Sequence, residues 1–357
     1  MLFIEQENNL SCIIGLSYNF ISKTSMSDKN INNSPFNTLK NIVEKDLSHV
    51  NELLFSMAKS HDAQLIDKIS SHILSAGGKR IRPILCLVFA RLFNQECMDQ
   101  IYLAAAIECI HTATLLHDDV IDESETRRGL KTANNIWGDK ASILVGDFLF
   151  SQAFKLMVNT GSIKALEILA TASAIISESE VMQLDQIGNI DMDLDSYNKL
   201  INSKTAELFA AASSTGAMSA GANEDLVSDS RDYGRALGMC FQIVDDVLDY
   251  TGKQESFGKE IGNDFFEGKV TAPLIFAIKN ASIEDKEKIK SLFVNRHQNG
   301  AFEKVKELII KNKGVEDSLR FAQEYADSGL KILENFPNNQ IRNGLKGLFL
   351  QIILRNN

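Results

Sequence analysis

Apolar residues along this chain recur with helical rather than alternating spacing, in stretches long enough to form helices. Residues 84–93 and 101–116 are dense in Ala, Leu and Ile, and Pro83 stands directly before the first of them, where proline suits an opening helical turn. No proline occurs from residue 84 to residue 272, so nothing in that span blocks long helices. Both segments are therefore predicted to be mostly buried helices.

Short polar or glycine-containing breaks separate the helix-length segments. They fall near residues 75–82, 122–132, 159–162, 188–195, 221–224, 251–269, 295–300 and 335–339. We find no alternating run typical of a strand between them. The pattern predicts an all-α protein, a large single-domain bundle of roughly ten or more helices over residues 36–357. Residues 24–36 are polar and rich in Asn and Ser, and residues 1–35 are predicted to form a disordered leader, with Met26 as an alternative start.

Charge and cysteine content narrow the class of partner and the compartment. The chain has 37 Lys and Arg against 47 Asp and Glu, a formal net charge of −10, which disfavours nucleic acid as the main partner. Five cysteines without a C-x-x-C pair predict neither a disulfide framework nor a zinc site, and fit a reducing, cytoplasmic setting. No uncharged apolar stretch reaches the roughly 18 residues of a spanning helix. Glu5 and Glu7 precede the first apolar patch, so neither a membrane span nor a signal peptide is expected.

Two aspartate clusters share the pattern D-D-V-aliphatic-D, at residues 118–122 and 245–249. The first and last aspartates of each cluster are four apart, so they lie on one face of a helix. An acidic run is usually a solvated helix face, but two matched clusters that each follow an apolar approach indicate carboxylates that hold a cation. The spacing of a calcium-binding EF-hand is absent, whereas hard oxygen ligands beside a phosphate-bearing substrate suit Mg²⁺. The candidate metal ligands are Asp118, Asp119, Asp122, Asp245, Asp246 and Asp249.

Basic segments near these clusters indicate an anionic ligand. Residues 77–83 and Arg127-Arg128 combine phosphate-binding side chains with glycine, and arginine binds phosphate oxygens in a bidentate way. Lys204-Thr205 and the loop 258–273 form a third basic region, whose glycines and lysines suit a flap over phosphates. His111 stands two helical turns before the first aspartate cluster and could face the same cavity. Each feature alone also fits a solvated helix start, an ordinary loop or a structural histidine.

Taken together, these motifs resemble those of the trans-prenyl diphosphate synthases. In chain order they are G-G-K-R-I-R-P at residues 77–83, H-D-D-V-I-D-E-S-E-T-R-R-G at 117–129, K-T-A at 204–206, F-Q-I-V-D-D-V-L-D at 241–249 and G-K-x-x-G-x-D at 258–264. The similarity covers roughly residues 40–355, and H-T-A-T-L-L-H-D-D at 111–119 extends it to the long-chain octaprenyl branch.

The resemblance implies an all-α prenyl synthase fold, normally a homodimer, that adds isopentenyl diphosphate repeatedly to an allylic diphosphate such as farnesyl diphosphate. It implies that Asp118, Asp122 and Asp245, supported by the other three aspartates, hold about three Mg²⁺ ions, which stabilise the departing diphosphate. The residues that match isopentenyl diphosphate binding are Lys79, Arg82, His111 and Arg128. Those on the allylic side are Arg127, Lys204, Thr205, Gln242 and Lys259, and Arg127 and Lys204 join Asp118, Asp122 and Asp245 as catalytic residues. The released diphosphate is expected to remove the proton after condensation.

In the resembled family, product length depends on the residues about one helical turn before the first aspartate cluster, which form the pocket floor. They are Ala113 and Thr114 here, and their small size implies an open floor and a long product. Octaprenyl diphosphate is the expected product, with nonaprenyl or decaprenyl diphosphate as near alternatives and geranylgeranyl diphosphate as a shorter one. Ala113→Tyr is expected to shorten it. The natural use of the product would be a ubiquinone or menaquinone side chain.

Two other functions remain open from the sequence. A class I terpene cyclase also ionises diphosphates with Mg²⁺, but it needs no second substrate, whereas this chain carries two basic segments beside its two aspartate clusters. An inactive subunit of a heteromeric synthase could dispense with one cluster, whereas both are complete here. Because a long polyprenyl product is insoluble in water, we also expect transient, peripheral contact with a membrane during product release.

Overall fold

The computed structural model describes residues 34–93, 98–252 and 261–354. Pro35–Asn357 form one compact unit. The predicted leader lies almost wholly outside the described residues, as does Lys259, so the disorder of the leader and the substrate contact of that lysine stay predictions.

Helices account for most of the described residues. From the start of this unit to the end of α9 the elements are α2 (Pro35–Ile42), α3 (Glu44–Met57), α4 (Gln64–Ser75), α5 (Ile81–Leu92), α6 (Asp99–Ile121), β1 (Thr126–Arg127), β2 (Leu130–Lys131), α7 (Ala133–Trp137), α8 (Asp139–Asn159) and α9 (Ile163–Gln186). From there onward they are α10 (Leu194–Ile201), η2 (Asn202–Ala206), α11 (Glu207–Ser219), α12 (Glu224–Thr251), α13 (Asn263–Phe266), α14 (Ala272–Asn280), α15 (Ile283–Val294), α16 (Ala301–Lys311), α17 (Gly314–Ile332), η3 (Leu333–Asn335) and α18 (Gln340–Ile353).

Side-chain caps explain why several helices begin where the sequence breaks are. The Ser162 hydroxyl accepts a hydrogen bond from the backbone N–H of the third residue of α9, and the carboxylate of Asp193 and the amide oxygen of Asn223 do the same for α10 and α12. Each cap satisfies a backbone donor that has no partner inside the helix. The break near 159–162, for example, ends α8 at Asn159 and starts α9 at Ile163.

The all-α prediction is confirmed, with two local additions that the apolar pattern did not indicate. A small antiparallel hairpin pairs β1 with β2, and Arg128 and Gly129 turn it with φ of 53° and 76°. Strands of two residues are too short to show alternation. The segment η2 is a π-helical turn between α10 and α11, and such turns often occur at functional sites.

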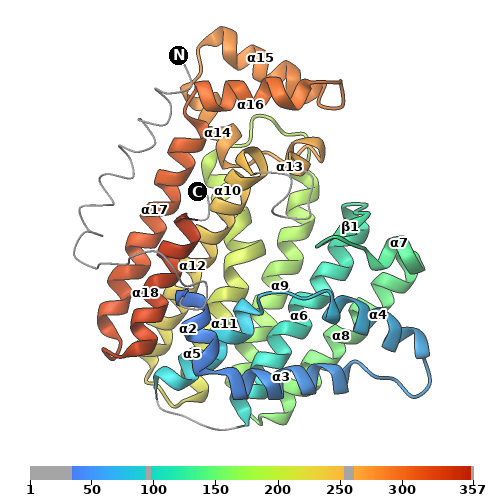
Figure 1. Cartoon of the computed structure of the whole chain (residues 1–357), viewed down its shortest axis with the longest axis vertical. Coiled ribbons are helices and arrows are strands. Elements are labelled where there is room, and N and C mark those ends of the chain that lie inside the picture. Colours follow the sequence, from blue (N-terminus) through green and yellow to red (C-terminus); the bar gives the residue numbers. More distant parts are fainter. Residues whose placement is uncertain (1–33, 94–97, 253–260, 355–357) are drawn as a thin grey trace. The chain divides into compact units, whose positions relative to one another are not determined.

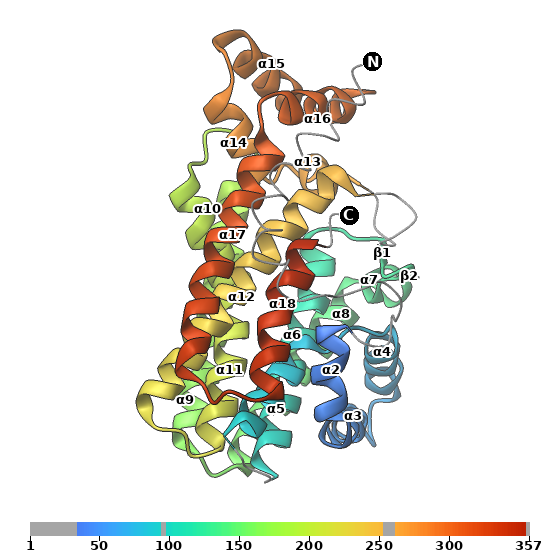
Figure 2. The same ribbon diagram turned by 60° about the vertical axis from the view of Figure 1, so that its left-hand side comes forward.

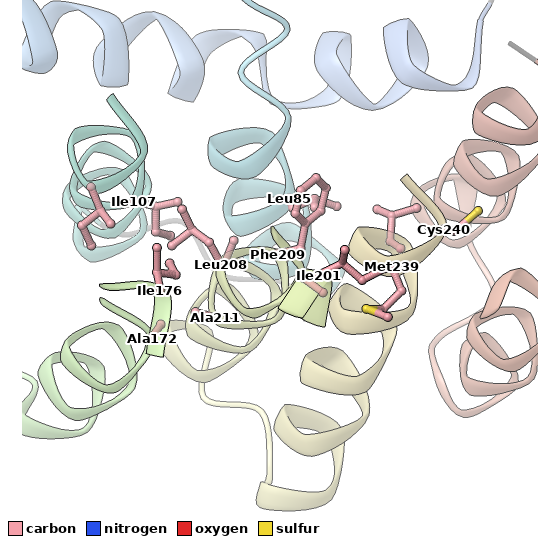
Figure 3. Packing of buried hydrophobic residues seen from close by; sticks show 14 of the residues in the cluster. Leu85, Ile107, Ala172, Ile176, Ile201, Leu208, Phe209, Ala211, Met239 and Cys240 are labelled. Atoms are coloured by element: carbon pink, nitrogen blue, oxygen red, sulfur yellow. The ribbon is translucent and has the colours of Figure 1, made fainter. Parts of the chain in front are cut away.

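The centre of the core is α11, which packs against α5, α9 and α12. Figure 3 shows Leu208, Phe209 and Ala211 of α11 among buried side chains such as Leu85 of α5 and Ile176 of α9. Small residues let these helices approach closely. At Gly216, for instance, an added Cβ would lie 2.1 Å from the backbone oxygen of Cys86, so the close contact between α11 and α5 depends on this glycine.

The long helix α12 lies between α11 and α17, with α18 beside it (Figure 2). Figure 1 shows the C-terminal end of α12 beside the short helix α13. On the other flank α6 packs against α8. Because α6 and α12 each carry an aspartate cluster near the C-terminal end, this arrangement decides where the two clusters meet.

One described helix, α8, is long and apolar enough to cross a membrane by those two criteria alone, with a mean hydropathy of 1.4 in its most apolar window. No such segment was expected from the sequence, because no uncharged apolar stretch reaches roughly 18 residues, and α8 itself contains Asp147 and Lys155. In the fold one face of α8 is buried, through residues such as Val145, Leu149 and Leu156, and that burial accounts for part of its apolar character.

Candidate active site

A cavity of about 590 Å³ lies between the two aspartate clusters. Its walls come from α5, α6, α9, α10, η2 and α12, and from the segments that follow α4, α6 and α12. The volume is in the range of small-molecule sites. Residues more than 160 positions apart in the sequence, such as Lys79 and Asp245, thus share one cavity, as the motif analysis expected.

In the first cluster, Asp118 and Asp122 line the cavity, as their four-residue spacing on α6 predicts. Asp119 is 1% exposed and is not part of the lining. Its Oδ1 instead accepts a hydrogen bond from Arg127 Nε at 2.7 Å. Asp119 therefore holds an arginine that lines the cavity, which is a supporting role distinct from direct contact with a metal.

In the second cluster, Asp245 and Asp246 line the cavity. Both oxygens of Asp246 accept hydrogen bonds from side chains, one from the Tyr197 hydroxyl at 2.6 Å and the other from Gln242 Nε2 at 2.7 Å. Burial raises the pKa of Asp246 well above its usual value. These two donors hold the carboxylate in one position beside Asp245.

Asp249, the last aspartate of the second cluster, binds protein backbone. Its carboxylate accepts hydrogen bonds from the backbone N–H groups of Gly262, Asn263 and Asp264 at 3.1–3.2 Å. They belong to Gly262, the N-cap residue of α13, and to the first two residues of that helix. N–H groups at a helix start have no partner inside the helix, and a carboxylate commonly caps them. Asp249 thus fixes the turn that follows the cluster.

The carboxylates that face the cavity fit a divalent cation. Asp118 Oδ1 is buried and has no hydrogen-bond partner among the residues that the structure describes. Burial raises the pKa of Asp118 to about 7, against the opposing charge of Lys204. Within the described ranges no three Asp, Glu, His or Cys side chains gather into a cage, and Mg²⁺ typically uses one or two carboxylates plus substrate phosphates. Asp118, Asp122 and Asp245 therefore fit a metal that is shared with a phosphate ligand.

Three cationic side chains line the cavity at and around the start of α5, namely those of Lys79, Arg82 and Arg128, and the side chain of His111 lies beside them. The Arg82 guanidinium lies 4.5 Å from the centroid of the Phe209 ring, and its Nη1 is 3.2 Å from His111 Nε2. Burial lowers the pKa of Arg82 to about 10, so the guanidinium keeps its charge at neutral pH. Its buried Nε has no partner among the described residues, which leaves a donor for an anionic ligand.

Backbone geometry places Arg128 in this group. Arg128 adopts a φ of 53° in the hairpin turn. Its guanidinium occupies the space that a side chain at position 78 would otherwise fill. A Cβ on Gly78 would lie 2.6 Å from Arg128 Nη1. The second glycine of the G-G-K-R motif therefore makes room for an arginine that lies about 50 residues later in the chain.

His111 is neutral in this environment. Burial lowers its pKa well below the usual value, and the nearby Arg82, Arg128, Arg127 and Arg80 lower it further. Below about pH 6.5 the unfolded chain binds a proton at this histidine that the folded protein does not bind. Stability is therefore lost as the pH falls, with a slope that approaches about 1.4 kcal/mol per pH unit for this one group.

We accordingly expect His111→Gln to reduce the loss of stability between pH 7 and pH 5, measured by urea unfolding at each pH. His49→Gln is the matched control, because His49 is exposed. Equal pH slopes for the wild type and His111→Gln would contradict the assignment of a neutral histidine.

Lys204 and Thr205 of η2 and Gln242 of α12 form a second set of polar residues in the cavity wall. Lys204 Nζ donates to Glu180 Oε2 at 2.7 Å. The Thr205 hydroxyl donates to Gln242 Oε1 at 2.7 Å, and Gln242 in turn donates to Asp246. The π-helical turn carries Lys204 and Thr205. Of the motif residues on the allylic side, Thr205 and Gln242 are thus joined to Asp246 of the second aspartate cluster by consecutive hydrogen bonds.

The two residues proposed for the pocket floor have different positions. Thr114 and Leu115 line the cavity, whereas Ala113 is 0% exposed and is not part of its wall. The reason is helical geometry: residue 114 is four positions from Asp118 and shares its face, while residue 113 is five positions away and is rotated off that face. A large side chain at position 113 would therefore change the pocket floor indirectly, by displacing the core residues packed behind it.

The cavity residues that were not identified from the sequence include Glu180, Tyr197 and Lys269, which pair with residues of the motifs. Glu180 pairs with Lys204, Tyr197 holds Asp246, and Lys269 Nζ lies 3.1 Å from Asp122 Oδ1. The loop 258–273 had been singled out for its glycines and lysines, which is the one signal that pointed towards Lys269. For the other two, nothing in a single sequence distinguishes them from ordinary helix residues.

The comparisons with known proteins agree with this geometry. The sequence profile of the polyprenyl synthetase family matches residues 63–309. Octaprenyl diphosphate synthase from Escherichia coli (strain K12) is 39% identical over 310 residues, 87% of this chain and 96% of that protein. A polyprenyl synthase from Caulobacter crescentus CB15, solved with calcium and isoprenyl diphosphate, superposes with a TM-score of 0.87 at 43% identity, covering 91% of this chain and 99% of that one. A decaprenyl diphosphate synthase from Rhodobacter capsulatus superposes with a TM-score of 0.85 at 41% identity, covering 90% and 99%. The chain therefore belongs to the polyprenyl synthetase family and is a prenyltransferase of the polyprenyl diphosphate synthase type.

Proposed function

We propose that the protein is a long-chain trans-polyprenyl diphosphate synthase that makes octaprenyl diphosphate by repeated addition of isopentenyl diphosphate to an allylic diphosphate such as farnesyl diphosphate. The observation that carries the proposal is that one cavity joins two separate cationic groups, around Arg82 and around Lys204, to carboxylates from two helices. Condensation of two diphosphates requires two anion sites. A terpene cyclase, with a single diphosphate substrate, requires one.

Asp118, Asp122 and Asp245 would hold the magnesium, about three ions in the family pattern, which acts as a Lewis acid on the allylic diphosphate. Lys204 and Arg127 line the cavity and both act electrostatically on Asp118, and they would orient that diphosphate by charge-assisted hydrogen bonds. Asp119 holds the Arg127 guanidinium in place. The binding energy is thus directed at oxygens on which negative charge grows as the carbon–oxygen bond breaks.

The group on the α5 side would bind the isopentenyl diphosphate. Arg82 and Arg128 supply paired N–H donors and Lys79 a point charge, while neutral His111 accepts from or donates to the neighbouring groups without adding charge. The isopentenyl double bond then attacks the allylic carbocation, and the released diphosphate takes up the proton.

The apolar part of the cavity wall supports a long product. Thr114, Leu115, Ile176, Leu200 and Phe241 continue the lining with small or apolar side chains. The E. coli relative is an octaprenyl synthase, and the R. capsulatus structure is a decaprenyl synthase, so nonaprenyl and decaprenyl diphosphate are the nearest alternatives. We propose that the cell uses this polyprenyl diphosphate as the source of a quinone side chain.

We also propose a homodimer that is cytoplasmic and touches membranes only transiently. The support is the outer face of α8, where Leu144 is 66% and Val158 is 63% exposed. Ile143 and Phe154 of the same helix are also exposed, at 41% and 40%, and an extended exposed apolar surface of this kind suits the contact with a second copy of the chain. Sedimentation equilibrium should give twice the chain mass, and Leu144→Lys with Val158→Lys should shift the protein to monomer. Unchanged mass in the double variant would remove this face from the interface.

The direct test is incubation of the purified protein with Mg²⁺, labelled isopentenyl diphosphate and farnesyl diphosphate, followed by sizing of the dephosphorylated products. A single long-chain product is expected. Ionisation of farnesyl diphosphate without isopentenyl incorporation would favour a cyclase. No reaction by folded protein would favour a subunit that needs a different partner chain.

A further inference from the structure

The first aspartate cluster already has a cation next to it. Lys269 Nζ lies 3.1 Å from Asp122 Oδ1, and the two side chains are 17% and 18% exposed. Both residues line the cavity. Asp122 is also one of the three carboxylates that fit the metal, so an ammonium group and a divalent cation would share this carboxylate.

The backbone of Lys269 is tied to the second cluster. Asp249 fixes Gly262, Asn263 and Asp264 through their N–H groups, and the backbone N–H of Lys269 donates to the carbonyl oxygen of Asp264 at 2.8 Å. The side chain then crosses to Asp122 on α6. Lys269 therefore links the first aspartate cluster to the second by way of Asp264.

The ammonium group also has a second partner. Lys269 Nζ is 2.7 Å from Glu267 Oε2. Burial alone would lower the pKa of Lys269, but the carboxylates of Asp122, Glu267 and Asp264 raise it above its usual value, so the group stays charged at any working pH. If it leaves Asp122 it keeps the partner Glu267, and no unpaired buried charge results.

Lys204 provides a useful contrast. It too is paired in the cavity, but its partner is Glu180, which is not among the carboxylates that fit the metal. Loss of the Lys204 pair is therefore not required for metal binding. At Asp122, by contrast, an ion pair occupies a carboxylate that is assigned to the cation.

We propose that Lys269 is a displaceable counter-ion of Asp122: it compensates this carboxylate while the metal is absent, and the entering divalent cation takes its place. The displaced ammonium stays in the cavity beside Glu267 and faces the diphosphate that arrives with the metal. Lys269 is a positioning residue in this scheme, because it acts through Asp122. The inference rests on the proposed metal-dependent function.

The test is Mn²⁺ binding to the full chain without any diphosphate, measured by the EPR signal of free Mn²⁺. Lys269→Met removes the competing cation and should bind Mn²⁺ about fivefold more tightly than the wild type, the size expected from one partly buried ion pair. Lys269→Arg keeps the charge and can pair with Asp122 in a bidentate way. It should bind Mn²⁺ no more tightly than the wild type.

Lys79→Met is the matched control, because it removes one positive charge from the same cavity at a position on the α5 side. It measures the general effect of charge on metal affinity. Equal tightening in Lys79→Met and Lys269→Met, or tightening in Lys269→Arg, would overturn the proposal. Failure of the wild type to bind Mn²⁺ both alone and with inorganic diphosphate would overturn this inference and the metal-dependent function together. Binding only with inorganic diphosphate, or wild-type binding that Lys269→Met leaves unchanged, would overturn the inference alone. Circular dichroism checks the fold, and the arginine variant keeps the test decisive if the methionine variant unfolds.

Discussion

Asp118→Asn should lower the rate of isopentenyl incorporation by about a thousandfold, with the substrates at saturating concentration. Asp118 has a buried oxygen without a described partner and is the carboxylate most dependent on an added cation. Loss of one metal carboxylate removes several kcal/mol of transition-state stabilisation, and about 4 kcal/mol corresponds to a thousandfold in rate. The measurement is turnover of labelled isopentenyl diphosphate over a series of Mg²⁺ concentrations.

The same substitution should not destabilise the metal-free protein. Burial penalises the Asp118 carboxylate, as its raised pKa shows, and asparagine is a neutral group of the same shape. The melting temperature without metal should therefore stay the same or rise. Asp185→Asn, at an exposed position of α9, is the matched control and should keep wild-type turnover. An Asp118→Asn enzyme with more than a tenth of wild-type turnover would exclude Asp118 as a metal ligand.

A tyrosine at position 113 or 114 should shorten the product by about two or more isoprene units, since an aromatic side chain buries about 150–250 Å². Thr114→Tyr places the ring on the cavity wall directly, because Thr114 lines it. Ala113→Tyr acts from the core, where Ala113 has no exposed surface. It should also cost about 1–3 kcal/mol of stability through overpacking.

Product chromatography after reaction with farnesyl diphosphate measures the change, and thermal unfolding measures the cost. Lys199→Tyr adds the same ring at an exposed position of α10 that does not line the cavity, and its product should stay long. A wild-type product distribution in both α6 variants would mean that the floor is formed elsewhere. Shortening in Thr114→Tyr alone would confine the floor to the face of α6 that carries Asp118.

The helices were predictable because local chemistry sets their ends. Ser162, Asp193 and Asn223 each cap a helix at a break that the sequence shows, and no proline interrupts the central span. The cavity-facing pair Asp118 and Asp122 was predictable for a similar reason, because a four-residue spacing fixes a shared helix face. Function followed from the order of the motifs.

Within the motifs, the sequence alone could not separate residues that face the ligand from residues that hold the protein together. Asp119 and Asp249 belong to the same D-D-V-aliphatic-D patterns as Asp118 and Asp245. The structure shows that Asp119 binds Arg127 and that Asp249 caps α13. Those partners lie eight to fifteen residues away through turns, and the apolar pattern carries no information on how such turns close.

The sequence by itself determined the helical class, the helix ends at the polar and glycine-containing breaks, the two carboxylate clusters and the two cationic groups, because each depends on residues close together in the chain. Only the tertiary structure decided that Glu180 pairs with Lys204, that Gly78 makes room for Arg128, and that Lys269 reaches Asp122. These contacts join segments from about 24 to 147 residues apart. Their formation depends on how α5, α6, α9 and α12 pack, and packing is a property of the whole fold.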